Sequence, residues 1–343
     1  MSERERWMNP DMQRWVGSVV GPGRFEPLFG DASGRRFYRW SADGGSWVAM
    51  DSGKVPLWPW LDIHKLLAEA DLPVPEILES LPQRGWVVQE DLGDTRMLDL
   101  EPEALSKHME MALELLARMQ ASLPHKNCSA SVAGRRYFTP TFFMAELEHT
   151  LEHLFFRLLR VPMEELETLQ LQMRELCGML EGGPRAFSHR DYHSANLMVV
   201  IRGLVMLDWQ DARFGPPEYD LVSLLRDSYL DIGPVWREKA ARFIQARGDS
   251  NMFRVAAAAC QRSLKAAGTF AYQYRAFERS RYLSSLPRTL RYLDEYAEIC
   301  PRLRDLVDNV YRIIDSFTGE IDLRGFRDSD SPVISEVLTG SGQ

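Results

Sequence analysis

Hydrophobic positions in the first ninety residues recur mostly at the spacing of β-strands. Alternating residues and aromatic β-formers, bounded by Gly and Pro turns, mark five short strands around one amphipathic helix. The predicted strands cover residues 24–29, 35–40, 46–50, 77–81 and 86–89, and the helix covers residues 61–70. We therefore expect a β-rich unit over residues 1–92.

From about residue 93 the apolar positions take on the 3.6-residue period of amphipathic helices. The predicted helical stretches cover residues 105–119, 144–158, 166–180 and, after Pro217, the chain to about Thr318. Two short apolar runs at residues 197–201 and 204–207 flank Arg202-Gly203, which predicts a buried hairpin. Residues 322–343 are rich in Ser, Asp and Gly, and we expect this tail to be partly disordered.

Length and composition narrow the class of protein. A chain of 343 residues is long enough for two domains or lobes. It has no run of eighteen apolar residues and no signal-peptide pattern at its start, so we expect a cytoplasmic protein with no membrane partner. The net charge of −8 disfavours nucleic acid as a partner. The four cysteines lie far apart, which indicates buried free thiols. No pattern bears on the oligomeric state.

The stretch from Phe187 to Leu197 carries the strongest chemical signal. It contains His-Arg-Asp, ending at Asp191, and then Asn196, which is the spacing of a kinase catalytic loop. Asp208 follows the predicted hairpin, at the position where a kinase has a second metal ligand, a carboxylate, after the loop asparagine. The pattern predicts that Asp191 faces an acceptor hydroxyl as the base and that Asn196 and Asp208 supply the hard oxygen ligands that Mg²⁺ prefers.

A polar turn that only caps buried elements is the alternative interpretation of the same residues. Three matching features in the right order, with a buried hairpin between Asn196 and Asp208, favour phosphoryl transfer over such a turn.

Three segments together resemble the aminoglycoside phosphotransferase family of small-molecule kinases, and the resemblance covers nearly the whole chain. The segments are His189-Arg190-Asp191-Tyr192-His193-Ser194-Ala195-Asn196, Leu207-Asp208-Trp209-Gln210-Asp211-Ala212 and Tyr219-Asp220-Leu221. Gly30-Asp31-Ala32-Ser33 with Arg35-Arg36, and Glu90-Asp91-Leu92-Gly93-Asp94, look like the bacterial branch that phosphorylates N-acetylmuramate and N-acetylglucosamine during cell-wall recycling.

The resemblance implies an α+β, bilobal, protein-kinase-like fold that uses ATP and Mg²⁺. A small β-rich lobe would span residues 1–92, a hinge residues 89–94, and a larger helical lobe residues 93–343. Asp191 would be the catalytic residue, Asn196 and Asp208 the metal ligands, and Asp220 a brace for the catalytic loop. The expected nucleotide-binding residues are Gly30, Asp31, Ala32, Ser33, Gly34, Arg36, Gln89, Glu90 and Leu92.

One departure from protein kinases concerns the third strand. Kinases place a lysine there that binds the α- and β-phosphates, but Val48-Ala49-Met50 is followed here by Asp51. A carboxylate would repel a phosphate, so either the register differs or another cation substitutes. Arg36, Arg39 and Lys54 are the candidates, and Arg36 is preferred because it lies on the strand that leaves the loop. A solvated surface arginine is the competing interpretation for each.

The acceptor is expected to be a small molecule. Only eleven residues separate Asp208 from Asp220, which leaves no room for the activation loop that docks protein substrates. We expect transfer to a sugar hydroxyl, and the anomeric hydroxyl of N-acetylmuramate or N-acetylglucosamine is favoured. Asp211, Arg262 and Arg275 are the candidate acceptor-binding residues. An aminoglycoside or another small alcohol as acceptor, and a pseudokinase without turnover, remain the alternatives.

Overall fold

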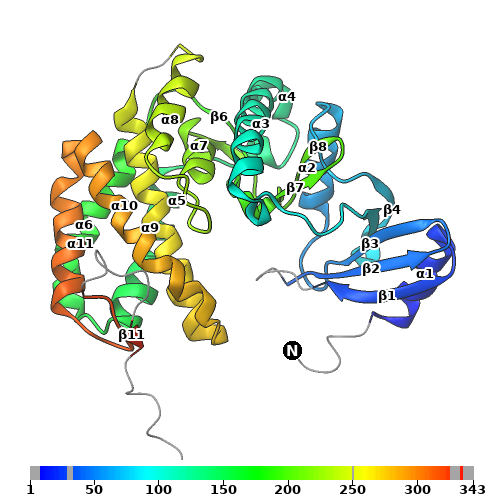
Figure 1. Ribbon diagram of the computed structural model, residues 1–343, viewed down its shortest axis with the longest axis horizontal. Coiled ribbons are helices and arrows are strands. Elements are labelled where there is room, and N and C mark those ends of the chain that lie inside the picture. Colours follow the sequence, from blue (N-terminus) through cyan, green and yellow to red (C-terminus); the bar gives the residue numbers. More distant parts are fainter. Residues whose placement is uncertain (1–7, 29–33, 249–250, 325–332, 335–343) are drawn as a thin grey trace, which may run out of the picture. The chain divides into compact units, whose positions relative to one another are not determined.

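A computed structural model of the protein shows two compact units along the chain (Figure 1). The structure describes residues 8–28, 34–248, 251–324 and 333–334. The first unit contains Met1–Arg135 and Ala195–Ala212, and the second contains Arg136–Ser194 and Arg213–Gln343. This division differs from the expected boundary at residue 92. The physical reason is the hairpin after Asn196, whose backbone N–H groups bond to carbonyls earlier in the first unit.

The first unit is built on a five-stranded antiparallel sheet, as the strand periodicity predicts. Its strands follow the spatial order β1-β2-β3-β5-β4. Its elements are α1 (Pro10–Val20), β1 (Gly23–Leu28), β2 (Arg36–Ala42), β3 (Gly45–Asp51), α2 (Trp58–Glu69), β4 (Ile77–Leu81), β5 (Trp86–Glu90), α3 (Pro102–Ser122), α4 (His125–Cys128), β7 (Leu197–Val200) and β8 (Gly203–Met206).

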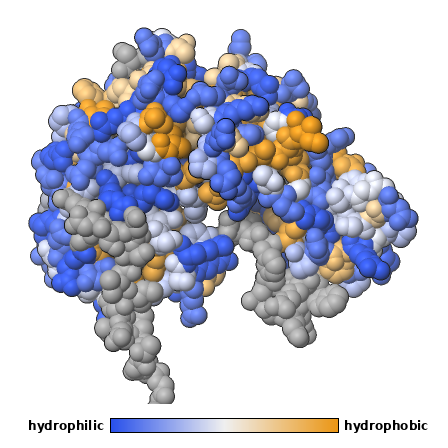
Figure 2. All heavy atoms as spheres, viewed as in Figure 1, coloured by the Kyte–Doolittle hydropathy of each residue, from blue (hydrophilic) through white to orange (hydrophobic). Residues whose placement is uncertain are grey.

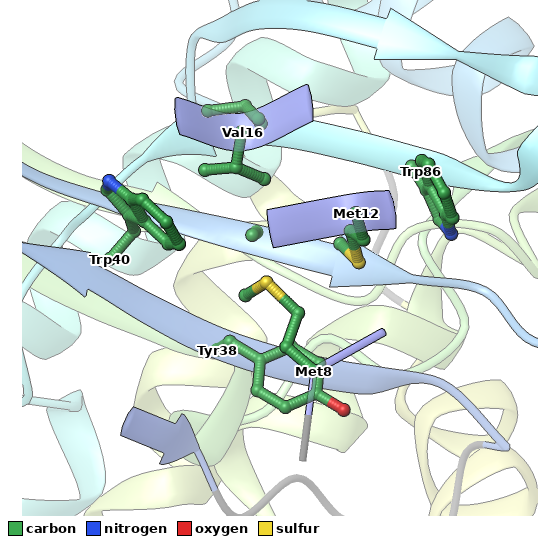
Figure 3. Packing of buried hydrophobic residues seen from close by; sticks show 8 residues of the cluster. Met8, Met12, Val16, Tyr38, Trp40 and Trp86 are labelled. Carbon is green, nitrogen blue, oxygen red and sulfur yellow. The ribbon is translucent and has the colours of Figure 1, made fainter. Parts of the chain in front are cut away.

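Helix α1, which is not among the elements expected from the sequence, covers one face of this sheet. It begins at Pro10 after Asn9, whose side chain accepts a hydrogen bond from the backbone N–H of Asp11. Its buried side chains pack on the large aromatic residues of β2 and β5 (Figure 3). The labelled members of this core are Met8, Met12, Val16, Tyr38, Trp40 and Trp86.

The hairpin β7–β8 also belongs to the first unit and is the buried hairpin that the sequence predicts. Its register pairs Leu197 with Met206. The N–H of Val199 bonds to the carbonyl of Thr95 at 2.8 Å, and the N–H of Met206 bonds to that of Pro73 at 2.9 Å. These bonds join the hairpin to segments that precede it by more than a hundred residues, so it cannot belong to the helical unit.

The second unit is mostly helical. Its elements are α5 (Pro140–Thr150), a π-helical segment (Leu151–Leu158), α6 (Met163–Met179), β6 (Ala186–Ser188), β9 (Arg213–Gly215), α7 (Glu218–Leu225), α8 (Val235–Gln245), α9 (Met252–Phe277), α10 (Leu286–Ile299), α11 (Arg304–Ser316), β10 (Ile321–Asp322) and β11 (Val333–Ile334). Most of the tail from residue 322, where disorder is expected, lies outside the described residues.

Helix α9 runs through the second unit and packs closely against α5. A Cβ atom added at Gly268 would come within 2.6 Å of the Cα of Thr150, so only glycine allows this approach. The hydroxyl of Thr150 donates to the carbonyl of Leu264 at 2.9 Å. The contact fixes the rotation of α9 and thereby the direction in which its charged residues point.

The surface in view is mainly hydrophilic, with hydrophobic residues gathered in small patches (Figure 2). No helix in the described part of the chain is both long and apolar enough to span a membrane. All four cysteines are free and buried, as their spacing in the sequence predicts.

Candidate active site

A cavity of about 530 Å³ opens in the first unit between the sheet and the base of the β7–β8 hairpin. We call it the sheet pocket. Its walls combine apolar side chains, which suit a flat aromatic ligand, with polar groups at one side. The apolar lining residues are Leu28, Phe37, Val48, Trp60, Met198 and Leu207, and the polar ones include Arg35, Gln89, Glu90, Asn196 and Asp208.

The hairpin brings Asn196 and Asp208 to the same end of the sheet pocket. The N–H of Leu207 bonds to the carbonyl of Asn196 at 2.9 Å, so the residues that flank β7 and β8 lie side by side. Asp208 has a positive φ of 65°, a strained conformation for a residue with a side chain. The neighbouring Trp209 anchors it, because the indole N–H donates to the carbonyl of Trp60 at 3.0 Å. An amide oxygen and a carboxylate here match the donors that Mg²⁺ takes from protein.

The segment from Gln89 to Asp94, the expected hinge, is held by ion pairs. Arg39 donates Nε to Asp91 at 2.7 Å and Nη2 to Asp94 at 2.8 Å. Burial works to raise the pKa of Asp91, but the hydrogen bond from Arg39 lowers it. The guanidinium of Arg202 on the hairpin holds both carboxylate oxygens of Glu90 and lowers its pKa. These ion pairs hold the segment in place along one wall of the sheet pocket.

The structure places only some of the expected nucleotide-binding residues at the sheet pocket. Gly30, Asp31, Ala32 and Ser33 lie outside the described residues. Gln89, Glu90 and Leu92 line the sheet pocket, whereas Gly34 and Arg36 are absent from its lining. Arg36 instead donates to Asp51 at 2.7 Å, so the carboxylate that stands in the place of the strand-three lysine already has a cationic partner.

Asp191 lies in the second unit, at the centre of a cluster of charged residues. Lys265 on α9 places its Nζ 3.3 Å from Oδ1 of Asp191, and Arg262 places Nη1 at 3.8 Å from the same oxygen. Burial alone would raise the pKa of Asp191, but Lys265, Arg190 and Arg262 hold it well below its usual range. The side chain of Asp191 is 24% exposed, so the ionised carboxylate is only partly covered by the cluster.

Glu146 on α5 contacts the cations of this cluster. It accepts hydrogen bonds from Arg190 at 3.1 Å and from the amide of Gln261 at 3.0 Å. Its oxygen lies 3.9 Å from Nζ of Lys265. Burial lowers the pKa of Lys265, while Asp191 and Glu146 oppose that shift. Glu146 thus fixes the cations that surround Asp191.

Two buried aspartates hold the catalytic loop in place. Asp220 on α7 accepts hydrogen bonds from the hydroxyl of Ser188 at 2.9 Å and from the N–H groups of His189 and Arg190 at 2.6 and 2.9 Å. Asp227, just after α7, accepts from the N–H and the hydroxyl of Ser194. Between these anchors Arg190 takes a positive φ of 80°. The hydrogen bonds to Asp220 and Asp227 hold this strained backbone directly before Asp191.

The structure places the other two expected acceptor residues, Arg275 and Asp211, in different units. Arg275 lies thirteen residues after Arg262 on the same helix, which is about 20 Å along the axis at 1.5 Å per residue. Its Nε pairs with Glu320 at 3.0 Å. Asp211 lies in the first unit and is absent from the lining of the sheet pocket. Of the two expected acceptor residues in the second unit, Arg262 lies beside Asp191 and Arg275 does not.

Four residues that the structure places in these sites are not among those expected from the sequence. Lys265 lies three positions after Arg262, which predicts the same helix face, and Asp227 lies seven positions after Asp220. Both spacings are signals that the sequence contains. Arg35 belongs to a segment that carries the family resemblance, but that resemblance does not distinguish it from Arg36. Glu146 carries no such signal, because its contacts come from distant segments.

Comparison with known proteins agrees with the fold and the motifs. Residues 24–258 match the phosphotransferase enzyme family. The chain is 31% identical to the N-acetylmuramate/N-acetylglucosamine kinase of Pseudomonas aeruginosa over 310 residues, which cover 84% of this chain and 88% of that protein. It is 29% identical to the enzyme of the same name from Neisseria meningitidis serogroup B, over 87% of this chain and 95% of that protein.

The structure is also similar to that of an aminoglycoside phosphotransferase in a ternary complex with ADP and hygromycin B. The TM-score is 0.56 at 15% identity, covering 87% of this chain and 98% of that chain. This likeness confirms the bilobal, protein-kinase-like α+β fold. The chain belongs to the phosphotransferase enzyme family, and the protein is a small-molecule kinase.

Proposed function

We propose that this protein transfers the γ-phosphoryl group of ATP to the anomeric hydroxyl of N-acetylmuramate or N-acetylglucosamine, which gives the sugar 1-phosphate. The observation that carries the proposal is the ionised, partly exposed carboxylate of Asp191 beside Lys265 and Arg262. The names of relatives that match most of the chain support the choice of acceptor.

The sheet pocket would hold the nucleotide. Its volume and apolar walls suit an adenine ring, and Oε1 of Gln89 is buried there without a hydrogen-bond partner among the described residues. A buried carbonyl oxygen of this kind matches the amino group of adenine. Asn196 and Asp208 at the end of this pocket would hold Mg²⁺. The metal, when bound, neutralises charge on the phosphate oxygens.

Asp191 would orient the acceptor hydroxyl and take its proton. Because its pKa is held low, Asp191 is a weak base, and the proton moves only after the bond between the γ-phosphorus and the leaving ADP has largely broken. That order suits the loose transition state of phosphoryl transfer. The hydrogen bonds that Asp220 and Asp227 accept hold the loop on both sides of Asp191 and so would fix the position of its carboxylate.

The cations beside Asp191 favour an acceptor that carries a carboxylate. Arg262 and Lys265 are 14% and 16% exposed and lie on one face of α9, so a carboxylate on the acceptor can reach both. N-acetylmuramate carries such a group and N-acetylglucosamine does not. A polycationic aminoglycoside would meet repulsion at the same place.

An acceptor panel with ³¹P NMR tests this function. The panel contains N-acetylmuramate, N-acetylglucosamine, an aminoglycoside and choline, each with ATP and Mg²⁺. The expected product shows coupling between phosphorus and the C1 proton of the amino sugar. A phosphate ester of another acceptor only, or nucleotide binding without any product, would reject the proposal.

Asp191→Asn tests the role of the base. We expect kcat to fall about 10²- to 10⁴-fold while ATP affinity stays close to that of the wild type. Asp308→Asn, at an exposed position on α11, is the matched control with unchanged kcat. An unchanged kcat in Asp191→Asn would exclude this carboxylate as the base.

A further inference from the structure

The phosphates of ATP in the sheet pocket call for a cationic side chain. Asp51, which stands in the place of the strand-three lysine, is a carboxylate, and Arg36 is paired with it. Oδ2 of Asp51 accepts from Arg36 at 2.7 Å, and Oδ1 accepts from the N–H of Gly53 at 2.9 Å. The Arg36 side chain is 43% exposed, and the residue is absent from the pocket lining. The pair neutralises itself at the margin of the sheet, so the phosphate contact belongs to another side chain.

Three arginines line the sheet pocket, and two of them are engaged by carboxylates. Arg39 is bound by Asp91 and Asp94. Arg96 donates Nε and Nη2 to the two carboxylate oxygens of Asp99, both at 2.9 Å. These pairs shape the wall and leave Arg35 as the third lining arginine.

Arg35 is buried without a bound counter-ion among the residues that the structure describes. The residue is 9% exposed, and its Nε has no hydrogen-bond partner in that part of the chain. The carboxylates of Asp208 and Asp211 act on it only as neighbouring charges. A buried guanidinium presents five N–H donors, and leaving them unsatisfied in the interior costs free energy. Native proteins satisfy such groups with protein, water or a ligand.

We propose that Arg35 is the phosphate-binding cation of this kinase and replaces the lysine that other kinases carry on the third strand. The geometry points to the phosphates nearest the metal, because Arg35 lines the same pocket as Asp208, the expected Mg²⁺ ligand. The planar fork of a guanidinium binds two phosphate oxygens at once, which a lysine does not. The assignment rests on the proposed use of ATP.

Nucleotide titrations with full-length protein test the assignment without turnover. Isothermal titration calorimetry compares ATP and adenosine on the wild type, Arg35→Met, Arg35→Lys and the matched neighbour Arg36→Met. We expect the Kd for ATP to rise about 10- to 100-fold in Arg35→Met and less in Arg35→Lys, with adenosine binding unchanged. Arg36→Met, which loses a half-exposed ion pair, should stay within about threefold of the wild type.

Several results would overturn the proposal. Equal losses of ATP and adenosine affinity in Arg35→Met would show a structural role, and a loss of ATP affinity in Arg36→Met alone would assign the contact to Arg36. If Arg35→Met does not fold, Arg35→Lys with unchanged ATP affinity would still count against a bidentate contact.

A second measurement separates this assignment from the proposed function. Sodium tripolyphosphate should raise the melting temperature of the wild type and leave that of Arg35→Met unchanged. A wild type that binds tripolyphosphate through Arg35 but transfers no phosphoryl group would reject the proposed function and keep this assignment. If the wild type phosphorylates an amino sugar while Arg35→Met keeps full ATP affinity, the proposed function is kept and the assignment of Arg35 is rejected.

Discussion

Replacing Asp220 with alanine should destabilise the helical unit more than any change at the surface. The carboxylate is fully buried and accepts three hydrogen bonds, from the hydroxyl of Ser188 and from the N–H groups of His189 and Arg190. The alanine variant removes the carboxylate acceptor of both N–H groups; the N–H of Arg190 keeps the hydroxyl of Ser188 at 3.2 Å, and that of His189 loses its acceptor. The substitution also relieves the cost of burying a carboxylate, a cost visible in a pKa that burial raises to about 6.

The magnitude follows from these opposing contributions. A buried donor left unsatisfied costs about 1–3 kcal/mol, and removing one partner from a buried charged network costs about 3–5 kcal/mol. We therefore expect a loss of about 3–5 kcal/mol in the free energy of unfolding. For a domain of about 150–250 residues, this lowers the melting temperature by roughly 6–20 °C. The kcat should fall as well, because the strained backbone at Arg190 loses its anchor next to Asp191.

Differential scanning calorimetry and urea unfolding measure the stability, and initial rates with ATP and amino sugar measure kcat. Ser188→Ala is the matched control, since it removes one of the three hydrogen bonds and leaves both N–H contacts of Asp220 in place. This control should cost about 1 kcal/mol. If Asp220→Ala is no less stable than Ser188→Ala, the buried carboxylate is not the anchor of the loop.

Three further predictions concern charge and burial. Lys265→Met should raise the KM for N-acetylmuramate about tenfold and that for N-acetylglucosamine much less, because only the first offers a carboxylate to the lost cation; equal changes would contradict this. Since the pKa of Asp220 in the folded protein lies above its unfolded value, its ionisation costs stability, so urea unfolding should show wild-type stability falling from about pH 4 to pH 6 relative to Asp220→Asn. An absent difference in slope would refute that sign. The four cysteines should resist Ellman's reagent in the folded protein and react fully in urea, because burial raises the pKa of the thiols, to about 11 for Cys128; fast labelling of the native protein would contradict the burial.

Much of the architecture can be predicted from local patterns. The five strands, the hairpin after Asn196 and the main helices follow from period-two or 3.6-residue repeats of apolar side chains, which depend only on neighbouring residues. Helix α1 does not follow from such repeats. Its few buried residues, such as Met12 and Val16, form a narrow apolar stripe. This stripe is buried only because the sheet packs against it.

The sequence by itself determined the catalytic motif and the family to which it belongs, because Asp191, Asn196 and Asp208 occupy fixed positions along one short segment. It also indicated that Asp51 stands where a lysine is expected. Only the tertiary structure decided how neighbouring arginines differ. Arg35 and Arg36 are adjacent and chemically identical, yet one lies buried in the pocket and the other is paired with Asp51. Burial and counter-ions come from segments far away in the chain, so no local pattern encodes them.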